Sequence, residues 1–314
     1  ESPNQCTGPQ ARAGGRFPSA RGFHSGRRTM KKIAALMPAR NAAGTIAEAV
    51  ESMLWQEVPS GCHYEVLVLD DGSTDDTSAV LERISAKPHG RRLRVLRNEV
   101  NLGVSPSRNR LIEAAADAQY FFVMDADDIA LPGRIVAQVE ALDAGHDLVG
   151  TNVYNFGIMS GERHFSLQRL QHVVLAMIDQ RSFCHPAVAF NSKVARIGYR
   201  RPLCDYGLLT DVLLAGLDVT NIARPYLMYR VHRGSISNSL DAARVASLRQ
   251  TVCTIRAGYL AALLGIDSAT AESYSNCIER KIFRRESPED LVVLDGLSAR
   301  VWQRLGVGVD FRRV

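Results

Sequence analysis

Short hydrophobic runs alternate with helical patterns between residues 31 and 154. The runs are KIAALM (32–37), YEVLVL (64–69), LRVLR (93–97), YFFVM (120–124) and DLVGTNVY (147–154). Hydrophobic residues recur at helical spacing in 44–56, 73–84, 105–117 and 132–142. Short strands without polar interruptions are typical of a mostly parallel sheet that helices cover on both faces. The pattern therefore predicts an α/β fold.

Thr45 and Glu48 have the spacing of a capping box at the start of the first helix.

The regular alternation ends after Gly157. Two further helical patterns, 167–180 and 205–217, follow together with two strand-like runs, 186–190 and 226–232. From residue 241 to the end the pattern is mainly helical, and the chain contains no internal repeats. The second half of the chain is therefore expected to be less regular than the first.

Composition and charge exclude several classes of function. The chain has 314 residues, 46% of them hydrophobic, which is enough for a large core. Its formal net charge is +5, but residues 1–29 hold five arginines and one glutamate, a net +4. Because the remainder is nearly neutral, a nucleic-acid-binding face is not expected. Residues 1–29 are rich in Gly, Pro, Ser and Arg and are predicted to be a disordered extension.

The cysteines and the hydrophobic runs indicate the cellular compartment in which the protein is expected. Six cysteines occur without any C-x-x-C spacing, which argues against a zinc module or a disulfide scaffold. No hydrophobic run approaches the ~20 residues that span a bilayer. We expect a cytoplasmic protein whose contact with a membrane, if it has one, is peripheral.

Three polar clusters follow predicted strands. PARN (38–41) comes after the first strand, DDGSTDD (70–76) after the second and DADD (125–128) after the fourth. Ligands of open parallel sheets bind at the carboxyl ends of the strands, so the clusters are expected at one edge. The alternative for each cluster is a polar turn or a helix cap.

The DADD cluster is difficult to explain as a turn alone. Like charges ~4 Å apart repel by about 4 kcal/mol near a protein surface. A hard divalent cation would neutralise such a cluster and would complete its coordination with substrate phosphates. Neither a G-x-x-x-x-G-K-[ST] loop nor a G-x-G-x-x-G after the first strand is present. The sequence therefore predicts a Mn²⁺ or Mg²⁺ site for a nucleotide or diphosphate substrate.

Four segments resemble, in order and spacing, the nucleotide-sugar-binding segments of family 2 glycosyltransferases of GT-A fold. They are IAALMPARNAAGTIAEAVESMLWQ, EVLVLDDGSTDDT, NEVNLGVSPSRNRLIEAA and YFFVMDADDIALP, within residues 31–133. The resemblance implies a GT-A fold with a Rossmann-like sheet. It also implies an inverting, metal-assisted transfer of a sugar from a nucleotide donor, for which we expect a UDP-sugar.

The same resemblance implies roles for individual residues on the donor side. Base and ribose would be bound by Pro38, Ala39, Arg40, Asn41 and Asp71, with Asp125 and Ala126 beside the ribose, and Arg108 near the nucleotide or its phosphates. Asp125 and Asp127 would form the D-x-D pair and, together with His232, would be the metal ligands, with Asp128 as a second contact. His232, in YRVHRGSIS, would close over the metal and diphosphate; without the resemblance it would be an ordinary solvated or core histidine.

The second half resembles the family's acceptor-side elements through CHPAVAFNSKVARIGYR, CDYGLLTDVLLAG and YRVHRGSIS. Asp205 matches the general base of an acidic doublet whose first member is here Cys204. The Q-x-x-R-W signature of processive synthases is absent. The resemblance therefore implies a single sugar addition, to a glycan, a lipid-linked or a small-molecule acceptor, in the biosynthesis of cell-surface glycans or other glycoconjugates.

These inferences divide the chain into four parts. They are the extension 1–29, a nucleotide-sugar-binding half (30–155), an acceptor-binding half (156–240) and a helical C-terminal region (241–314). Two other functions remain open from the residues alone. A nucleotidylyltransferase would need a Gly- and Lys/Arg-rich phosphate loop at the first strand end, and a non-catalytic sugar-nucleotide- or glycan-binding protein would tolerate Cys204.

The C-terminal region mixes arginines with the aromatic residues Phe283, Trp302 and Phe311. Such a mixture could hold the enzyme on an anionic inner membrane face where a lipid-linked acceptor resides. The alternative is a helical cap with solvated arginines.

Overall fold

The computed structural model describes residues 30–165, 169–178, 182–200, 203–232 and 241–313. The extension predicted at 1–29 lies outside the described residues. Nine strands are formed within the described ranges: β1 (Lys31–Ala39), β2 (Cys62–Asp71), β3 (Leu93–Asn98), β4 (Tyr120–Val123), β5 (Ile129–Ala130), β6 (Leu148–Gly157), β7 (Gly161–Arg163), β8 (Ala189–Asn191) and β9 (Val219–Val231).

The helices fall into two groups. The first accompanies the strands: α1 (Ile46–Leu54), α2 (Thr77–Ser85), α3 (Val104–Ala114), α4 (Arg134–Asp143), α5 (Arg169–Met177), α6 (Ser192–Ile197) and α7 (Cys204–Leu214). The second follows the last strand: α8 (Ala242–Leu264), α9 (Ser268–Ile282) and α10 (Pro288–Leu305). Short 3₁₀ turns lie at η1 (Pro88–Arg92), η2 (His185–Ala187) and η3 (Phe311–Arg313).

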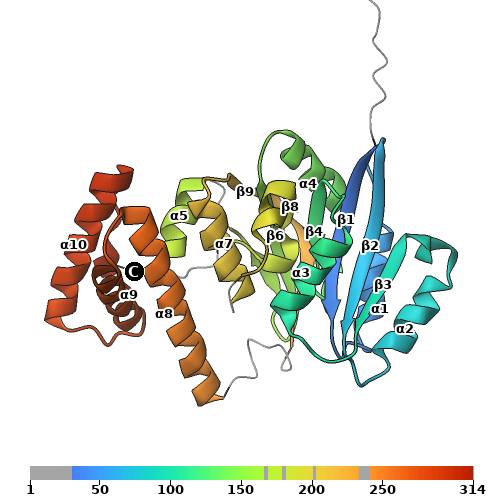
Figure 1. Ribbon diagram of the computed structural model, residues 1–314, viewed down its shortest axis with the longest axis horizontal. Coiled ribbons are helices and arrows are strands. Elements are labelled where there is room, and N and C mark those ends of the chain that lie inside the picture. Colours follow the sequence, from blue (N-terminus) through green and yellow to red (C-terminus); the bar gives the residue numbers. More distant parts are fainter. Residues whose placement is uncertain (1–29, 166–168, 179–181, 201–202, 233–240, 314) are drawn as a thin grey trace, which may run out of the picture.

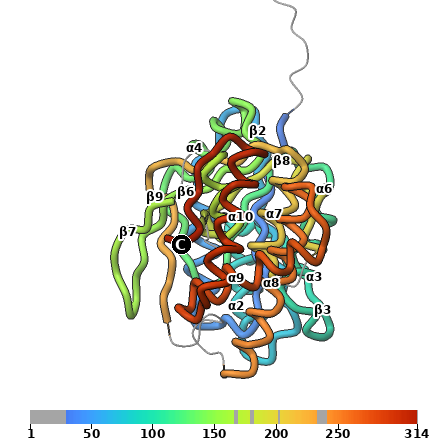
Figure 2. Tube along the Cα trace, turned by 90° about the vertical axis from the view of Figure 1, so that its left-hand side faces the viewer, coloured from blue at the N-terminus to red at the C-terminus, as the bar shows by residue number. Residues whose placement is uncertain are grey.

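All nine strands belong to one sheet, with the order β3-β2-β1-β4-β8-β6-β9-β5 and with β7 paired to β6. Strands β3, β2, β1 and β4 are parallel to one another, as the alternating pattern predicts. The second half is mixed, because β8 runs antiparallel to both β4 and β6. The α/β class is confirmed, and the strictly parallel arrangement is confined to the first half. In Figure 2 the hairpin of β6 and β7 stands out at the edge of the molecule.

The two faces of the sheet bury different helices. In β1, Ile33, Ala35 and Met37 pack with α1, α2 and α4 on one face. Ala34 and Leu36 point to the other face, where α3, α5 and α7 cover the sheet. This alternation follows from the two-residue period of a strand. The prediction of helices on both faces is confirmed.

The C-terminal helices pack onto the core that α3, α5 and α7 form on one face of the sheet, and they do not form a core of their own. Figure 1 shows α8, α9 and α10 beyond α5 and α7, on the side away from β1 and β2. Leu260 of α8 and Leu297 of α10 belong to the same buried cluster as the sheet residue Leu36. The buried hydroxyl of Tyr259 donates to the carbonyl oxygen of Val173 at 3.4 Å. No helix in the described ranges is long and apolar enough to cross a bilayer.

The first turn of α1 differs from the predicted capping box. Thr45 is the N-cap, but its side chain makes no capping hydrogen bond. Its hydroxyl donates instead to the carbonyl oxygen of Ala126, at 2.9 Å, and Glu48 pairs with Arg230. The capping box is therefore wrong: tertiary partners at the carboxylate turn replace the local ones.

A buried guanidinium supports the end of β4, directly before the carboxylate cluster. Arg134 is fully buried and donates to the carbonyl oxygens of Val123 at 2.7 Å and Pro186 at 2.8 Å. It also donates to the side chain of Gln138 at 3.0 Å. Burial lowers the pKa of Arg134 to about 10, and nearby negative groups oppose that shift. Arg134 therefore stays charged at neutral pH and joins β4 to the turn before β8.

We expect Arg134→Met to destabilise the fold strongly, because the two carbonyl oxygens lose their donor while remaining buried. Each buried group without a partner costs ~1–3 kcal/mol, so the free energy of unfolding should fall by about 3 kcal/mol. Urea unfolding at pH 7 measures it. Arg83→Met, on the exposed side of α2, is the control and should change the value by less than about 0.5 kcal/mol. A loss below about 1 kcal/mol in Arg134→Met would contradict this account.

Candidate active site

The loops after β1 and β2 are joined by hydrogen bonds. Ala39 and Asp70 are register partners at the ends of these parallel strands. The backbone N–H of Asn41 donates to Ser73 Oγ at 2.9 Å, and that of Thr74 donates to Asn41 Oδ1 at 2.8 Å. Asn41 takes a positive φ of 50°, which asparagine tolerates better than most residues. PARN and DDGSTDD therefore form one polar unit at the edge of the sheet, as predicted.

The predicted base and ribose residues are differently exposed in this unit. Arg40 and Asn41 are exposed, Pro38 is half-buried and Ala39 is buried in the core. Ala39 could therefore contact a ligand through its backbone alone. Asp71 is also buried, and its role at the base stays a prediction, as do those of the other four.

Asp71 holds the loop that leads into α3. Its carboxylate accepts hydrogen bonds from Asn98 Nδ2 at 2.6 Å and from the backbone N–H groups of Leu102 and Gly103 at 2.9 Å each. Burial raises its pKa, but these hydrogen bonds outweigh burial and hold the pKa below its ordinary value. Asp71 is therefore an ionised anchor at neutral pH.

Arg108 joins the carboxylate cluster to the start of α7. The side chain is 4% exposed; its Nη2 donates to Asp125 Oδ1 at 2.7 Å and its Nη1 to Cys204 Sγ at 2.9 Å. Burial raises the pKa of Asp125, the charge of Arg108 opposes that shift, and Asp127 adds to it. The guanidinium also lies over the ring of Tyr199, 5.5 Å from its centroid. Nη1 and Nη2 of Arg108 therefore both have protein partners. A contact between Arg108 and the nucleotide stays a prediction.

Asp127 and His232 lie together, as the predicted metal site requires. His232 Nε2 is 3.0 Å from Asp127 Oδ2, and both side chains are about two-fifths exposed. A carboxylate oxygen and an imidazole nitrogen suit Mn²⁺, and a carboxylate with few other protein ligands suits Mg²⁺. Within the described ranges no cluster of three or more such side chains is found. The pair fits an ion that would take its remaining ligands from a diphosphate and from water.

Asp128 has a different environment from its two neighbours. Its side chain is 1% exposed and Oδ1 accepts the backbone N–H of Arg230 at 2.8 Å. Burial, followed by the charges of Asp125 and Asp127, raises its pKa well above the ordinary value. Asp128 thus joins the turn to β9, and its role as a second metal contact stays a prediction.

Arg230 is a site residue that sequence reasoning missed. Its Nε donates to the carbonyl oxygen of Asp127 at 2.7 Å, and its Nη2 pairs with Glu48 at 2.6 Å. The guanidinium carbon lies 4.5 Å from the ring centroid of Phe156. Its position two residues before His232 was the one signal available in the sequence.

Asp205 lies in the first turn of α7, as predicted. The N-cap of this helix is Leu203, so Asp205 does not cap it. The carboxylate accepts the backbone N–H of Tyr206 at 2.8 Å and is close enough to Asp125 to raise the pKa of that group. Cys204 follows Leu203 directly and contacts Arg108, so the start of α7 adjoins the D-x-D turn. The role of Asp205 as base stays a prediction.

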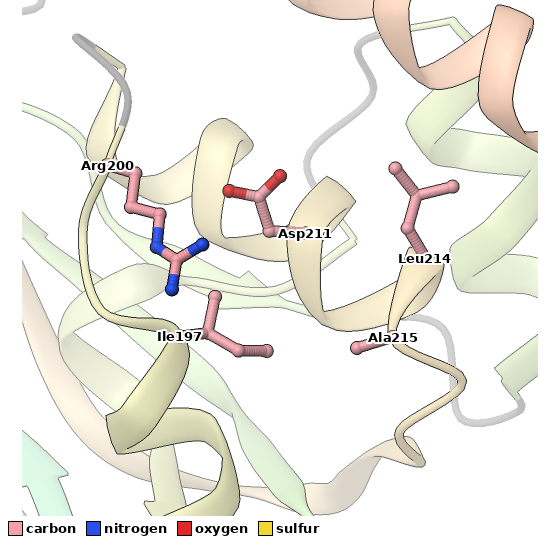
Figure 3. A pocket seen from close by; sticks show the side chains of 5 residues that line it. All are labelled: Ile197, Arg200, Asp211, Leu214 and Ala215. Atoms are coloured by element: carbon pink, nitrogen blue, oxygen red, sulfur yellow. The ribbon is translucent and has the colours of Figure 1, made fainter.

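A separate pocket lies between α6 and α7. It has a volume of about 470 Å³ and is lined by Ile197, Arg200, Asp211, Leu214 and Ala215. Figure 3 shows the side chains of Arg200 and Asp211 directed into the same space. None of the donor-side residues predicted from the sequence lines it, and Asp211 therefore serves as a comparison residue for Asp205.

The C-terminal aromatic residues do not share one exposed surface. Phe311 is buried and Trp302 is 61% exposed. Phe283 is 39% exposed, and the guanidinium carbon of Arg249 lies 3.7 Å from its ring centroid. Membrane contact through this region stays a prediction.

With this geometry in view, comparison with known proteins identifies the family. The sequence profile described as Glycosyl transferase family 2 matches residues 34–206. The chain belongs to this family. Its match includes all the donor-side residues discussed above that precede β9, and it ends one residue after Asp205.

Two curated relatives show the range of similarity. The succinoglycan biosynthesis protein ExoU of Rhizobium meliloti is 39% identical over 121 residues, which cover 38% of this chain and 33% of ExoU. The Escherichia coli protein WfaP, named a UDP-Glc:alpha-D-GlcNAc-diphosphoundecaprenol beta-1,3-glucosyltransferase, is 25% identical over 66% of this chain and 80% of WfaP. The chain thus spans about a third of the length of ExoU.

Solved structures share the fold. Staphylococcus aureus TarS in complex with UDP-GlcNAc superposes with a TM-score of 0.58 and 16% identity over 87% of each chain. The mannosyltransferase PcManGT of Pyrobaculum calidifontis, solved with GDP-Man and Mn²⁺, gives a TM-score of 0.52 and 14% identity, over 87% of this chain and 81% of PcManGT. At these identities the comparison establishes the GT-A type of fold.

The Arg108–Asp125 contact predicts a shift in the pH dependence of nucleotide binding. Without the guanidinium, Arg108→Met should raise the pKa of Asp125 further, so the ionised carboxylate persists only at higher pH. The acid-side loss of UDP affinity in the presence of Mn²⁺ should therefore move to higher pH, measured by calorimetric titration from about pH 4 to about pH 8. Arg110→Met, on the same helix, is the control. An unchanged midpoint would contradict the role given to Arg108.

Proposed function

We propose that the protein is a non-processive, inverting glycosyltransferase that transfers one sugar from a nucleoside-diphosphate donor to an acceptor hydroxyl. The observation that carries the proposal is the contact of Arg108 with both Asp125 and Cys204. It brings the D-x-D turn next to the start of α7, where Asp205 lies. Groups suited to a diphosphate and a group suited to an acceptor proton therefore adjoin one another. Family membership supports this assignment over a nucleotidylyltransferase.

The donor is proposed to be a UDP-sugar. TarS was solved in complex with UDP-GlcNAc and the name of WfaP includes UDP-Glc, whereas PcManGT was solved with GDP-Man. The acceptor is proposed to be a glycan, a lipid-linked saccharide or a small molecule, since WfaP acts on a diphosphoundecaprenol compound by its name. Synthesis of a cell-surface polysaccharide is the proposed context, at the cytoplasmic side of a membrane.

Charge sets the chemistry expected of the residues. Asp127 and His232 would hold Mn²⁺ or Mg²⁺, which supplies Lewis-acid stabilisation of a leaving diphosphate. Asp125, whose ionised form the charge of Arg108 favours, would accept hydrogen bonds from the ribose. Asp205 would take the proton of the acceptor hydroxyl at its carboxylate as that hydroxyl attacks. Attack from the side opposite the diphosphate inverts the anomeric centre.

Nucleotide binding should depend on a divalent ion, because the carboxylates of the turn otherwise repel the diphosphate. Wild-type protein should bind UDP much more tightly with Mn²⁺ than with EDTA, and Asp127→Asn should lose most of that difference. Calorimetric titration of UDP under both conditions measures it. Equal wild-type affinity in Mn²⁺ and EDTA would contradict the metal assignment.

Asp205→Asn tests the base, because asparagine keeps the shape of the side chain and cannot accept the proton. Turnover should fall at least ~100-fold, the low end of what a general base contributes. UDP affinity and melting temperature should stay near those of the wild type. UDP release is measured with a donor and acceptor that the wild type uses. Asp211→Asn, further along α7 in the separate pocket, is the matched control.

Retained turnover in Asp205→Asn, with loss in Asp211→Asn, would move the base to the pocket between α6 and α7. The absence of turnover in the wild type with every sugar nucleotide tested would favour the non-catalytic binding protein instead.

A further inference from the structure

Two backbone carbonyl groups of the D-x-D turn are each held by a side chain from a distant element. Thr45, at the start of α1, donates to the carbonyl oxygen of Ala126 at 2.9 Å. Arg230, near the end of β9, donates to the carbonyl oxygen of Asp127 at 2.7 Å. The peptide groups on both sides of the Asp127 α-carbon therefore have fixed partners.

Arg230 is itself held in place by several contacts. Its guanidinium pairs with Glu48 of α1 at 2.6 Å and lies over the ring of Phe156, and its backbone N–H donates to Asp128. The side chain of Arg230 is 22% exposed, whereas that of Glu48 is 61% exposed. Thr45 and Glu48 lie at the N-cap and in the first turn of one helix, so α1 contacts the turn both directly and through Arg230.

The same segment that provides Arg230 also provides the partner of Asp127. His232 follows Arg230 by two residues and lies 3.0 Å from Asp127 Oδ2. A displacement of Arg230 would therefore move the Asp127 backbone and the histidine that faces it at the same time. Metal sites depend on such supporting contacts, because they fix the orientation of the coordinating side chains.

We infer that Thr45, Glu48 and Arg230 are positioning residues that set the spacing of Asp127 and His232 for a divalent ion. We call these three residues the turn brace. The inference rests on the metal site of the proposed function and adds to it three residues that would not touch the ion. Exposed ion pairs contribute little to stability, so a purely structural Glu48–Arg230 pair would leave ion affinity unchanged.

The brace is tested by the affinity for Mn²⁺ in the presence of saturating UDP. Free Mn²⁺ is measured by electron paramagnetic resonance on the full chain for wild type, Glu48→Gln, Thr45→Val and Arg230→Lys. Arg230→Lys should weaken Mn²⁺ binding by roughly 10- to 100-fold, the range found for residues that orient metal ligands. Glu48→Gln and Thr45→Val should each give a smaller loss in the same direction.

Glu51→Gln is the matched control, because it removes an ion pair with Lys87 of 2.6 Å from the same helix without contacting the turn. Its Mn²⁺ affinity should equal that of the wild type. The double variant Glu48→Gln/Arg230→Lys should bind Mn²⁺ no more weakly than Arg230→Lys alone, because Glu48 acts through Arg230. Melting temperatures are recorded for every variant, and Glu48→Gln, at an exposed position, keeps the test valid if Arg230→Lys folds poorly.

The outcomes separate this inference from the proposed function. A wild type whose UDP binding needs Mn²⁺, with brace variants that match it in Mn²⁺ affinity, overturns the brace alone. A wild type that binds UDP equally with Mn²⁺ and with EDTA overturns the metal assignment and the brace together. Weaker Mn²⁺ binding in the brace variants, together with unchanged Mn²⁺ affinity in Glu51→Gln, supports the turn brace.

Discussion

Repulsion among three carboxylates in four consecutive residues is the constraint around which the site is built. Each of the three carboxylates is stabilised by a different partner in this fold. Asp125 pairs with the buried charge of Arg108, Asp127 faces His232, and Asp128 is buried against the backbone of Arg230. These partners come from α3 and from the end of β9, which are far apart in the sequence. The contacts that stabilise the turn therefore depend on both halves of the sheet.

These different surroundings also suit the three carboxylates to different roles. Asp128 is buried, with a strongly raised pKa, and suits a structural role. Asp127 is 36% exposed and Asp125 is 33% exposed, so both carboxylates are open to a ligand. They differ in their partners, because the charge of Asp125 is balanced by the buried guanidinium of Arg108, whereas Asp127 faces His232. One polar turn thus combines an anchor with a binding group, which a motif of identical residues does not reveal.

The position of the polar clusters at one edge of the sheet could be predicted from sequence, because the signals are local. Strand ends followed by polar clusters located PARN, DDGSTDD and DADD, and the parallel register of β1 with β2 and β4 brought them to one edge. The mixed second half was not predictable in the same way. Strand β5 has two residues, too few for a periodic pattern, and the strand-like run at 186–190 overlaps β8 only at Ala189 and Phe190. The places of both strands depend on pairing with β9 and β4. Arg230 was missed because its partners include a backbone carbonyl group, which leaves no trace in sequence.

The shared core of α5 and the C-terminal helices has a consequence for how the chain unfolds. Tyr259 reaches Val173, and Leu260 packs in the same buried cluster as one face of β1. The residues that join these helices to the sheet are thus part of the buried core. They do not form an interface between two separately folded domains. Heat or denaturant should therefore disrupt both regions in one cooperative transition.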